Sequence, residues 1–362
     1  MLWWRRFVQG DDSKTVPKSL ISVSEACLKI LDQRALPGAV QYIDCVNVDE
    51  VIEAIGCLAV RGAPAIGLSA AFGLILDLDG QPENADKILL ELQARGDRLI
   101  ASRPTAVNLA WAVEQMLHYA RSSACQLGGP GWRQRLYAQA QSLFEADREA
   151  CRKIGEAGVA LLEGRKNILT HCNAGALAVS EYGTALAPIY VAKARGQSIN
   201  VWVDETRPLL QGARLTAFEL MAHDVSCQLI TDNMAAHVMA SGQVDLVLVG
   251  ADRVAANGDA ANKIGTLGLA VLAHHYGIPF VVACPWSTID LETRSGSDIV
   301  IEERDSNEVC SFQGVRSAPD GMKAFNPAFD VTPADLITAL VTERGVLRAP
   351  FSVELKAALA AG

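Results

Sequence analysis

The sequence predicts an α/β protein whose larger part is a parallel sheet flanked by helices. Five short apolar runs rich in β-branched residues follow one another after residue 166, separated by segments of helix length: "NILTH", "INVWVDE", "CQLITD", "VDLVLVGAD" and "PFVVACP". Strands that are apolar along their whole length are typical of sheets covered on both faces. A chain of 362 residues is also long for one core, so two domains are expected.

The first third of the chain predicts a small α-rich domain with a short β edge. Two strand-like pieces, "CLKILDQ" and "VQYIDC", precede stretches of helical character. Helices are expected over 48–60, 64–78, 104–121 and 133–162. "CQLGGPGWRQ" predicts a linker before the last of these, because Gly-Gly-Pro-Gly cannot continue a helix. The predicted domains are therefore 1–126, α-rich, and 127–362, a Rossmann-like catalytic domain.

Composition and charge limit the class of partner. Half of the residues are apolar and a fifth are charged, as in soluble globular proteins. The formal net charge of −9 argues against a nucleic-acid binder with a generally basic surface. We find no signal-peptide or membrane-helix pattern, so a cytoplasmic protein without a membrane partner is expected. Nine cysteines without a CxxC pair predict neither a disulfide framework nor a zinc site.

Polar and reactive residues follow the predicted strands at their carboxyl ends, where open α/β sheets bind ligands. They are Cys172, Asp204 with Glu205, Asp232 with Asn233, Asp252, and Cys284. A helix expected from Ala174 would place Cys172 at a helix N-terminus, which stabilises a thiolate. Taken alone, Cys172 could equally be a buried, inert thiol. Asp232 is expected to be the N-cap of the next helix. Asp252 is expected at a strand tip before a long loop, where no helix requires a cap.

Four stretches indicate phosphate binding, although neither GxGxxG after the first strand nor GxxxxGK[ST] occurs. In "VRGAPAIG", Arg61 precedes a turn that opens a helix, which brings backbone N–H groups and a guanidinium together. Arg103 precedes Pro-Thr at a second expected helix start, and Asn262 with Lys263 stands at a third. Gln211 lies in the fourth stretch, "RPLLQGARL". Three cations beside helix starts are unusual in an acidic protein.

Nine motifs, in order from about residue 32 to 347, carry a family resemblance: "RGAPAIG", "RPTAVNL", "THCNAGALA", "DETRPLLQGARLTAFEL", "DNMAAH", "VGADRVAANGDAANKIGT", "STID", "IEERD" and "NPAFDVTP". Together they resemble the S-methyl-5-thioribose-1-phosphate isomerases of methionine salvage. That family shares a superfamily with ribose-1,5-bisphosphate isomerases and with regulatory subunits of a eukaryotic translation-initiation exchange factor.

The resemblance implies an aldose–ketose isomerase that acts on a small sugar phosphate and forms a homodimer. It makes Cys172 and Asp252 the catalytic pair. It assigns substrate contacts to Arg61, Gly62, Ala63, Arg103, Gln211, Asn262 and Lys263. We expect the site in the cleft between the two domains, with no metal and no cofactor.

The chemistry of such a substrate accounts for the residue types. Its anomeric oxygen is esterified to phosphate, so the furanose cannot open to an aldehyde until an acid acts on the ring oxygen. Asp252 could be that acid if burial keeps it protonated. Cys172 could be the base for the C2 proton or could steady a hydride passing from C2 to C1, and the sequence does not choose between these routes.

Two other functions remain open. The first is an isomerase of ribose 1,5-bisphosphate, which needs a second phosphate site in place of an apolar pocket for the methylthio group. Trp286 and the stretch "AVNLAWA" favour the apolar pocket. The second is a non-catalytic regulatory subunit that binds a sugar phosphate or nucleotide. Cys172 and Asp252 together argue against it, because a pure binder needs neither an acid nor a nucleophile.

Overall fold

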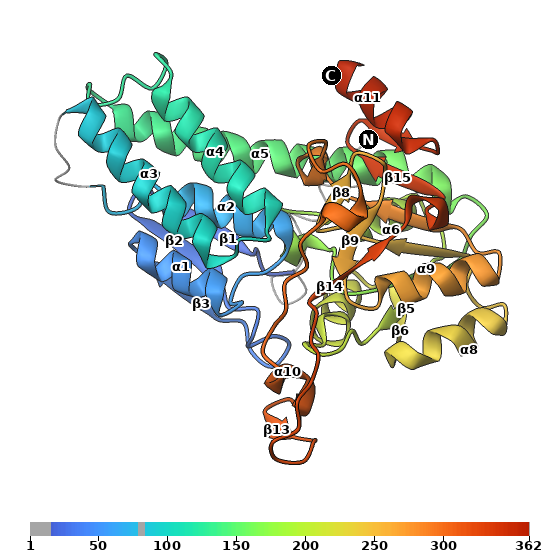
Figure 1. Cartoon of the computed structure of the whole chain (residues 1–362). Helices are drawn as coiled ribbons and strands as arrows, with labels where there is room; N and C mark the ends of the chain where they lie inside the picture. The colour runs from blue at the N-terminus through green and yellow to red at the C-terminus, as the bar shows by residue number, and fades with distance from the viewer. Residues whose placement is uncertain (1–15, 79–83, 362) are drawn as a thin grey trace. The chain divides into compact units, whose positions relative to one another are not determined.

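The computed structural model describes residues 16–78 and 84–361, which form two compact units (Figure 1). The N-terminal unit comprises Pro17–Cys151 and Ala176–Gly183, and the C-terminal unit comprises Arg152–Gly175 and residues 184–361. The division falls within helix α5 (Trp132–Gly158), later in the chain than the expected linker. The reason is that the first half of α5 packs into the N-terminal core, whereas Ile154 belongs to the C-terminal core.

The N-terminal unit is α-rich with a short antiparallel sheet, as predicted. Its elements are β1 (Leu20–Ser24), β2 (Cys27–Leu31), β3 (Tyr42–Cys45), α1 (Val48–Gly56), α2 (Ala63–Gly73), α3 (Ala85–Ser102) and α4 (Val107–Arg121). Strand β2 lies between its two neighbours, with Leu28 opposite Cys45. The expected helices 48–60 and 64–78 end earlier than predicted, and helix α3 was not expected. Pro104 and Thr105 form a turn between helices rather than the start of α4.

Helix α2 is the centre of the N-terminal core. Every one of its 11 residues is buried, as expected for a helix that is apolar on all sides. Gly67 allows the close approach of α4, because a Cβ atom at this position would lie 2.5 Å from the backbone oxygen of Asn108. The position of α2 is therefore set by backbone contact as well as by side-chain packing.

The C-terminal unit is built on a seven-stranded sheet. Its strands are β4 (Asn167–Thr170), β5 (Asn200–Asp204), β6 (Ser226–Ile230), β7 (Leu246–Val249), β10 (Phe280–Ala283), β15 (Ala339–Thr342) and β16 (Gly345–Leu347). In space they run β16-β15-β10-β7-β4-β5-β6, and all neighbours are parallel except β16, which is antiparallel to β15. The predicted parallel sheet is confirmed.

Helices cover both faces of this sheet. They are α6 (Leu186–Ala194), α7 (Ala217–Ala222), α8 (Ala235–Ala240), α9 (Thr266–His275) and α11 (Phe351–Ala361). Along β7, Leu246 and Leu248 pack in one core with α6 and α7, while Val247 and Val249 pack in the other with α8, α9 and α11. The two-residue alternation of a strand thus serves two apolar layers, which explains why the predicted strands are apolar along their whole length.

The strand order defines a topological switch point in the C-terminal unit. The chain passes from β4 outward to β5 and β6, then returns to the other side of β4 to form β7, β10 and β15. Strands β4 and β7 are adjacent and parallel, with Leu169 beside Val247. In doubly wound sheets, ligands bind beyond the carboxyl ends of the strands at this point. The residues that follow β4 and β7 are therefore the first candidates for a functional site.

A second, smaller sheet follows β7. Strands β8 (Arg253–Ala255) and β9 (Ala260–Lys263) form an antiparallel hairpin, which β11 (Ile289–Asp290) and β14 (Phe329–Thr332) extend at its two edges. The long loop expected after Asp252 is thus a hairpin. Helix α10 (Asn307–Cys310) and the hairpin of β12 (Ser311–Phe312) and β13 (Val315–Arg316) project from this unit (Figure 1). Among the described residues, no helix is long and apolar enough to cross a membrane.

Replacing Gly67 by Ala tests the contact between α2 and α4. The new methyl group would meet the backbone of Asn108, which cannot move aside as a flexible side chain can. We expect a loss of about 1–3 kcal/mol in the free energy of unfolding, measured by urea denaturation. Gly56→Ala is the control, because nothing lies within 4 Å of a Cβ atom there. The control should be neutral or slightly stabilising. Equal stabilities of the two variants would contradict the assigned contact.

Candidate active site

Cys172 follows β4 in a strained backbone conformation. Its φ angle is 60°, in the left-handed region that non-glycine residues seldom adopt. The side chain is buried. The α-helix expected from Ala174 does not form: only a short 3-10 turn, Ala176–Ala178, follows. The proposed stabilisation of Cys172 by a helix N-terminus is therefore wrong. The left-handed backbone of a buried thiol at a strand end is instead the observation that makes Cys172 a candidate functional residue.

Two threonine hydroxyl groups hold the backbone of Cys172. Its N–H donates to Thr206 Oγ1 at 2.8 Å, and its carbonyl accepts from Thr216 Oγ1 at 2.6 Å. Thr206 follows β5 and is itself left-handed, with φ 67°. Thr216 ends the π-helical turn Gly212–Thr216. Both threonines are buried, so each hydrogen bond forms away from competing water.

Asn173 is held by a buried carboxylate. Its Nδ2 donates to Glu219 Oε1 at 2.8 Å and lies 3.2 Å from Thr216 Oγ1. Glu219, on α7, has no exposed surface. Gly175 leaves room for it, because a Cβ atom there would lie 2.3 Å from Glu219 Oε2. Cys172, Asn173 and Gly175 thus each contact a different part of one polar network, which is formed by Thr206, Thr216 and Glu219.

Thr206, Thr216 and Glu219 are functional candidates beyond the predicted set. All three lie in the motif "DETRPLLQGARLTAFEL", together with the predicted Asp204, Glu205 and Gln211. A buried Glu in an otherwise apolar helix requires a specific partner.

Asp252 lies beyond the carboxyl end of β7, as expected. Its N–H donates to the carbonyl of Ala261 on β9 at 2.9 Å, which fixes the start of the β8–β9 hairpin. Asp232, by contrast, is not the N-cap of its own helix. Its carboxylate accepts from the backbone N–H groups of Thr206 at 2.8 Å and Arg207 at 2.7 Å, and so holds the loop that follows β5.

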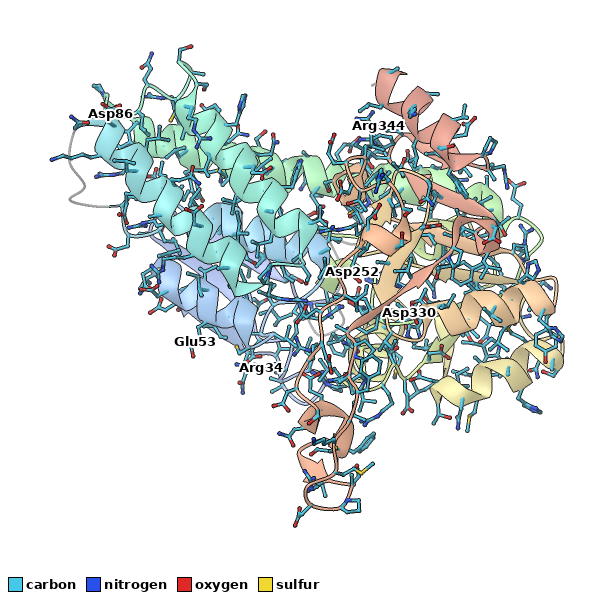
Figure 2. The ribbon with its side chains drawn as sticks, viewed as in Figure 1. Arg34, Glu53, Asp86, Asp252, Asp330 and Arg344 are labelled. Carbon is cyan, nitrogen blue, oxygen red and sulfur yellow. The ribbon has the colours of Figure 1, made fainter. Side chains whose placement is uncertain are left out.

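The segments that carry Cys172 and Asp252 pack against each other. They extend from adjacent parallel strands, and a Cβ atom at Gly250 would lie 2.8 Å from the Cβ atom of Ala174. Glycine at position 250 therefore permits the close contact of the two strand-end segments. Figure 2 shows Asp252 with its side chain drawn beside the strands of the smaller sheet. The structure thus places the predicted catalytic residues on one edge of one sheet.

Gln211, Asn262 and Lys263 are buried in the same unit. Gln211 directly precedes the π-helical turn, and its Oε1 atom has no hydrogen-bond partner among the described residues. Asn262 and Lys263 end strand β9 rather than open a helix. Asn262 Nδ2 donates to Thr266 Oγ1 at 3.0 Å, and Lys263 Nζ donates to the carbonyl of Ala328 at 2.8 Å.

Arg61, Gly62 and Ala63 lie at the start of α2 in the N-terminal unit. Gly62 has a φ of 93° and precedes the helix, and within the described part of the chain no side chain caps this end. A Cβ atom on Gly62 would lie 2.5 Å from Ala178, so only glycine fits. Arg61 Nε donates to Gln33 Oε1 at 3.1 Å, which orients the guanidinium. Arg103 follows α3 and its backbone N–H donates to Ile100.

Trp286 makes a contact that the sequence did not indicate. The guanidinium of Arg344 lies 4.0 Å from the centre of the Trp286 ring, and the backbone N–H of Trp286 donates to Glu343 Oε2 at 2.9 Å. A face of the indole is thus occupied by a cation within the protein.

Cys284 is almost completely buried, and burial raises the pKa of its thiol far above the ordinary value. It is therefore an apolar packing residue.

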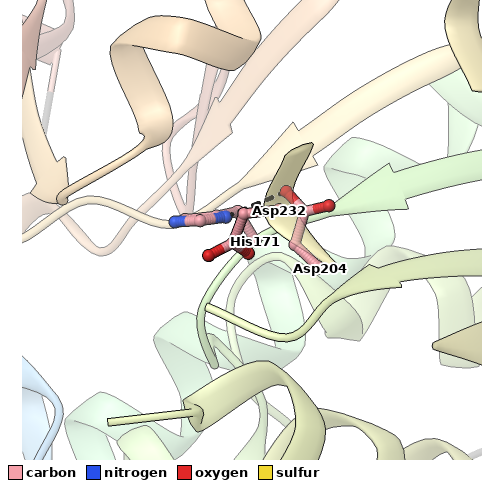
Figure 3. Close-up of side chains that lie close together, drawn as sticks. All are labelled: His171, Asp204 and Asp232. Atoms are coloured by element: carbon pink, nitrogen blue, oxygen red, sulfur yellow. Dashed lines mark hydrogen bonds and ion pairs between the residues drawn. The ribbon is translucent and has the colours of Figure 1, made fainter. Parts of the chain in front are cut away.

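His171, Asp204 and Asp232 could each direct one ligand atom toward a common ion, since these atoms lie within 4.8 Å of one another (Figure 3). Each side chain already takes part in at least one hydrogen bond, however. His171 Nδ1 is hydrogen bonded to Asp204 Oδ2 at 3.0 Å, and the carboxylate of Asp232 accepts two backbone N–H groups. The cluster is thus a hydrogen-bonded network, and we assign no metal to it.

A doubly wound sheet with a strained thiol and a carboxylate at its switch point is typical of enzymes that act on small molecules. The comparisons with known proteins agree. A model of the initiation factor 2 subunit family matches residues 59–349, and the chain belongs to this family.

Named relatives define the class more narrowly. The chain is 52% identical over 328 residues to a methylthioribose-1-phosphate isomerase from Chloroflexus aurantiacus, with 90% of this chain and 94% of the relative covered. A methylthioribose-1-phosphate isomerase from Geobacillus thermodenitrificans is 47% identical, with 95% and 96% covered.

Solved structures give the same fold. The 5-methylthioribose 1-phosphate isomerase from Pyrococcus horikoshii OT3 has a TM-score of 0.86 at 39% identity, covering 98% of this chain and 99% of that one. A structure described as the delta subunit of translation initiation factor eIF-2B from A. fulgidus has a TM-score of 0.82 at 41% identity, with 95% and 100% covered.

Thr206→Val tests whether the threonine hydroxyl positions Cys172. Valine keeps the shape but leaves the N–H of Cys172 without its acceptor, so the backbone can leave the left-handed conformation. We expect a loss of about 1–3 kcal/mol in stability and at least about a tenfold fall in kcat. Thr206→Ser keeps the hydroxyl and should retain most of the turnover. Wild-type kcat in folded Thr206→Val would show that the hydroxyl has no part in positioning the thiol.

Proposed function

We propose that this chain converts S-methyl-5-thioribose 1-phosphate, an aldose, into S-methyl-5-thioribulose 1-phosphate, a ketose, in methionine salvage. The observation that carries the proposal is the match to curated isomerases at 52% identity over 90% of the chain. The switch-point positions of Cys172 and Asp252 support it, because this isomerisation needs an acid and a second group that acts at C2.

We assign the chemical steps to this pair. Asp252 protonates the ring oxygen, which opens a furanose whose anomeric oxygen is blocked by phosphate. Cys172 then acts at C2, either as a base or as the group that steadies a hydride on its way to C1. The constrained backbone of Cys172 supports this role, since a fixed thiol loses little freedom on reaching the reactive geometry.

Substrate contacts in the C-terminal unit are proposed from buried polar atoms. The Oε1 atom of Gln211, which lacks a hydrogen-bond partner among the described residues, can accept from a sugar hydroxyl group. Asn262 and Lys263 share the β8–β9 hairpin that begins next to Asp252. We propose that both contact the substrate, although the bond from Lys263 Nζ to Ala328 already fixes that ammonium group.

The N-terminal unit supplies a phosphate-binding element in this proposal. The start of α2 combines backbone N–H groups, the positive end of a helix and the guanidinium of Arg61. Gln33 supports this arrangement, because it accepts from Arg61 and donates through Nε2 to the carbonyl of Leu177 at 2.8 Å. Gly62, Ala63 and Arg103 are assigned to the same role.

A regulatory, non-catalytic function is the second candidate, favoured by the A. fulgidus structure described as an initiation-factor subunit. The constrained thiol argues against it, because binding alone gives no reason to keep Cys172 in a strained conformation. Ribose 1,5-bisphosphate remains the alternative substrate. Because the guanidinium of Arg344 covers a face of the Trp286 ring, Trp286 gives less support to an apolar pocket for the methylthio group.

Two further proposals concern the state of the protein in the cell. We propose a cytoplasmic location. All nine cysteines lie within the described part of the chain and none of them forms a disulfide, which supports this location.

We also propose a homodimer. Strand β6 is an edge of the large sheet and carries the exposed side chain of Leu229, with exposed Met234 nearby in the chain. Exposed apolar edge strands pair readily with another chain.

Turnover of the two sugar phosphates by wild-type protein and by Cys172→Ser, Asp252→Asn and the double variant tests the function. We expect wild type to convert S-methyl-5-thioribose 1-phosphate in preference to ribose 1,5-bisphosphate. Each single variant should be nearly inactive while still binding substrate, and the double variant scarcely worse, because groups that act as a unit are not additive. Cys284→Ser is the control and should remain active. Wild-type protein that turns over neither substrate, or active and folded Cys172→Ser, would refute the proposal.

Arg61→Met and Arg103→Met test phosphate recognition. Charge-assisted hydrogen bonds contribute roughly 1.5–3 kcal/mol, so each variant should raise KM by more than about tenfold. Arg98→Met is the matched control, because Arg98 lies exposed on α3 in an ion pair with Asp49. Unchanged KM and kcat in both test variants would remove these arginines from the site.

A further inference from the structure

His171 connects two strand ends that the proposed reaction uses. It precedes Cys172 directly, and its side chain is almost completely buried. Nδ1 lies 3.0 Å from Asp204 Oδ2 at the end of β5 (Figure 3). Nε2 lies 2.8 Å from the carbonyl oxygen of Ile264, the residue after Lys263. The imidazole therefore bridges the Cys172 segment and the end of strand β9.

Gly265 makes this bridge possible. Its φ is 105°, and a Cβ atom there would lie 2.9 Å from His171 Cε1 and 3.0 Å from Nε2. The ring thus packs directly on the backbone of the loop between β9 and α9. The N–H of Gly265 on this loop and the N–H of Leu267 in the first turn of α9 donate to the carboxylate of Asp330 at 2.7 and 3.0 Å. The loop is held between an imidazole and a carboxylate.

Both ring nitrogens of His171 are engaged within the protein. A carbonyl oxygen can only accept, so Nε2 carries a hydrogen that it donates to Ile264. A further proton lies between Nδ1 and the carboxylate of Asp204. Because neither nitrogen is available to a substrate, His171 cannot be the acid or base of the reaction. Its geometry suits it to position its neighbours.

The surroundings favour retention of the shared proton. Burial raises the pKa of Asp204 to about 6, although the hydrogen bond to His171 opposes this. Burial alone would lower the pKa of His171, but the hydrogen bond and charge of Asp204 outweigh it, and the pKa is raised. The other ionisable groups acting on the pair are Asp232, Glu205 and Asp330, all acidic. The negative charge of these groups stabilises a proton between the two residues.

Asp204 retains a polar atom that packing does not require. Its Oδ1 atom is buried and has no hydrogen-bond partner among the described residues. An unsatisfied buried oxygen is unfavourable and needs an explanation. A carboxylate retained for its bond to His171 supplies one.

We propose that His171 and Asp204 are positioning residues for the isomerisation, and that their shared proton keeps the Cys172 segment and the Asn262–Lys263 strand end in register. The proposal rests on the proposed function, since it assigns the pair to the alignment of the same site. It predicts that loss of the bridge lowers kcat more than it affects substrate binding.

The test uses variants that break or keep the bridge. Asparagine at 171 is too short to reach Ile264, so His171→Asn should lower kcat at least about tenfold while KM changes less than about threefold. Asp204→Asn can donate to Nδ1 of a neutral imidazole, so it keeps both hydrogen bonds without the shared proton. Its kcat should lie between those of His171→Asn and wild type. His274→Asn, an exposed histidine on α9, is the control.

Stability measured against pH tests the pair independently of activity. The raised pKa of His171 means that the folded protein binds the shared proton more tightly than the unfolded chain. This contribution to stability is complete below the ordinary imidazole pKa of 6.5 and is lost as the pH rises through the raised value. As the pH rises above about 6.5, the Tm of wild type should therefore fall more steeply than the Tm of Asp204→Asn.

The outcomes separate this proposal from the proposed function. Parallel Tm curves would overturn the shared proton, whether or not the protein is an isomerase. If wild type turns over the substrate, unchanged kcat in folded His171→Asn would overturn the positioning role. If chelation abolished activity and one divalent metal restored it, the proposal of a shared proton between His171 and Asp204 would be overturned in favour of a bound metal ion. If wild type is inactive, the proposed function fails, and the positioning role with it.

Discussion

The hydrogen bonds from Thr206 and Thr216 to the backbone of Cys172 are the constraint on which the site depends. A left-handed non-glycine residue costs about 1–2 kcal/mol, and two buried hydrogen bonds of about 0.5–1.5 kcal/mol each can offset this. The constraint requires the large sheet to be in register. Thr206 reaches Cys172 because β5 pairs with β4, with Val203 beside Thr170.

Carboxylates fix the loops at this edge of the sheet. Asp232 holds two backbone N–H groups of the loop after β5, and Asp330 holds one of the loop before α9 and one of the first turn of α9. Glu219 binds the side chain of Asn173. Each acid satisfies donors that would otherwise be unpaired in a loop, where no ladder of backbone hydrogen bonds exists. These acidic residues thus hold the strand-end loops in place, and Cys172 and Asp252, the two residues assigned to chemistry, lie at the same edge of the sheet.

The parallel sheet could be predicted from the sequence because strand identity depends on local composition. The five predicted strands formed, and Cys172 and Asp252 were located from strand ends alone. Predictions that depended on distant partners were wrong. The helix expected from Ala174 did not form, because the backbone of Cys172 bonds to residues 34 and 44 positions away in the chain.

Other local predictions failed for a similar reason. Asp232 begins the 3-10 turn Asp232–Met234 and looks like a cap, yet its carboxylate accepts from backbone N–H groups 25 and 26 positions earlier. Asn262 and Lys263 were placed at a helix start because β14, which pairs with β9, lies far along the sequence. A local pattern identifies which residues are available for hydrogen bonding. It does not identify their partners when these are brought together only by the fold.

The interleaving of the two units along the chain constrains how the protein is made. Residues 176–183 belong to the N-terminal unit, where the carbonyl of Leu177 accepts from Ser19 and Gln33. During synthesis, β4 and Cys172 therefore leave the ribosome before the first unit is complete. Neither unit corresponds to one continuous piece of the gene, so a single cut cannot yield both as separate proteins. An ancestor assembled by simple end-to-end fusion of two finished domains is equally hard to reconcile with this order.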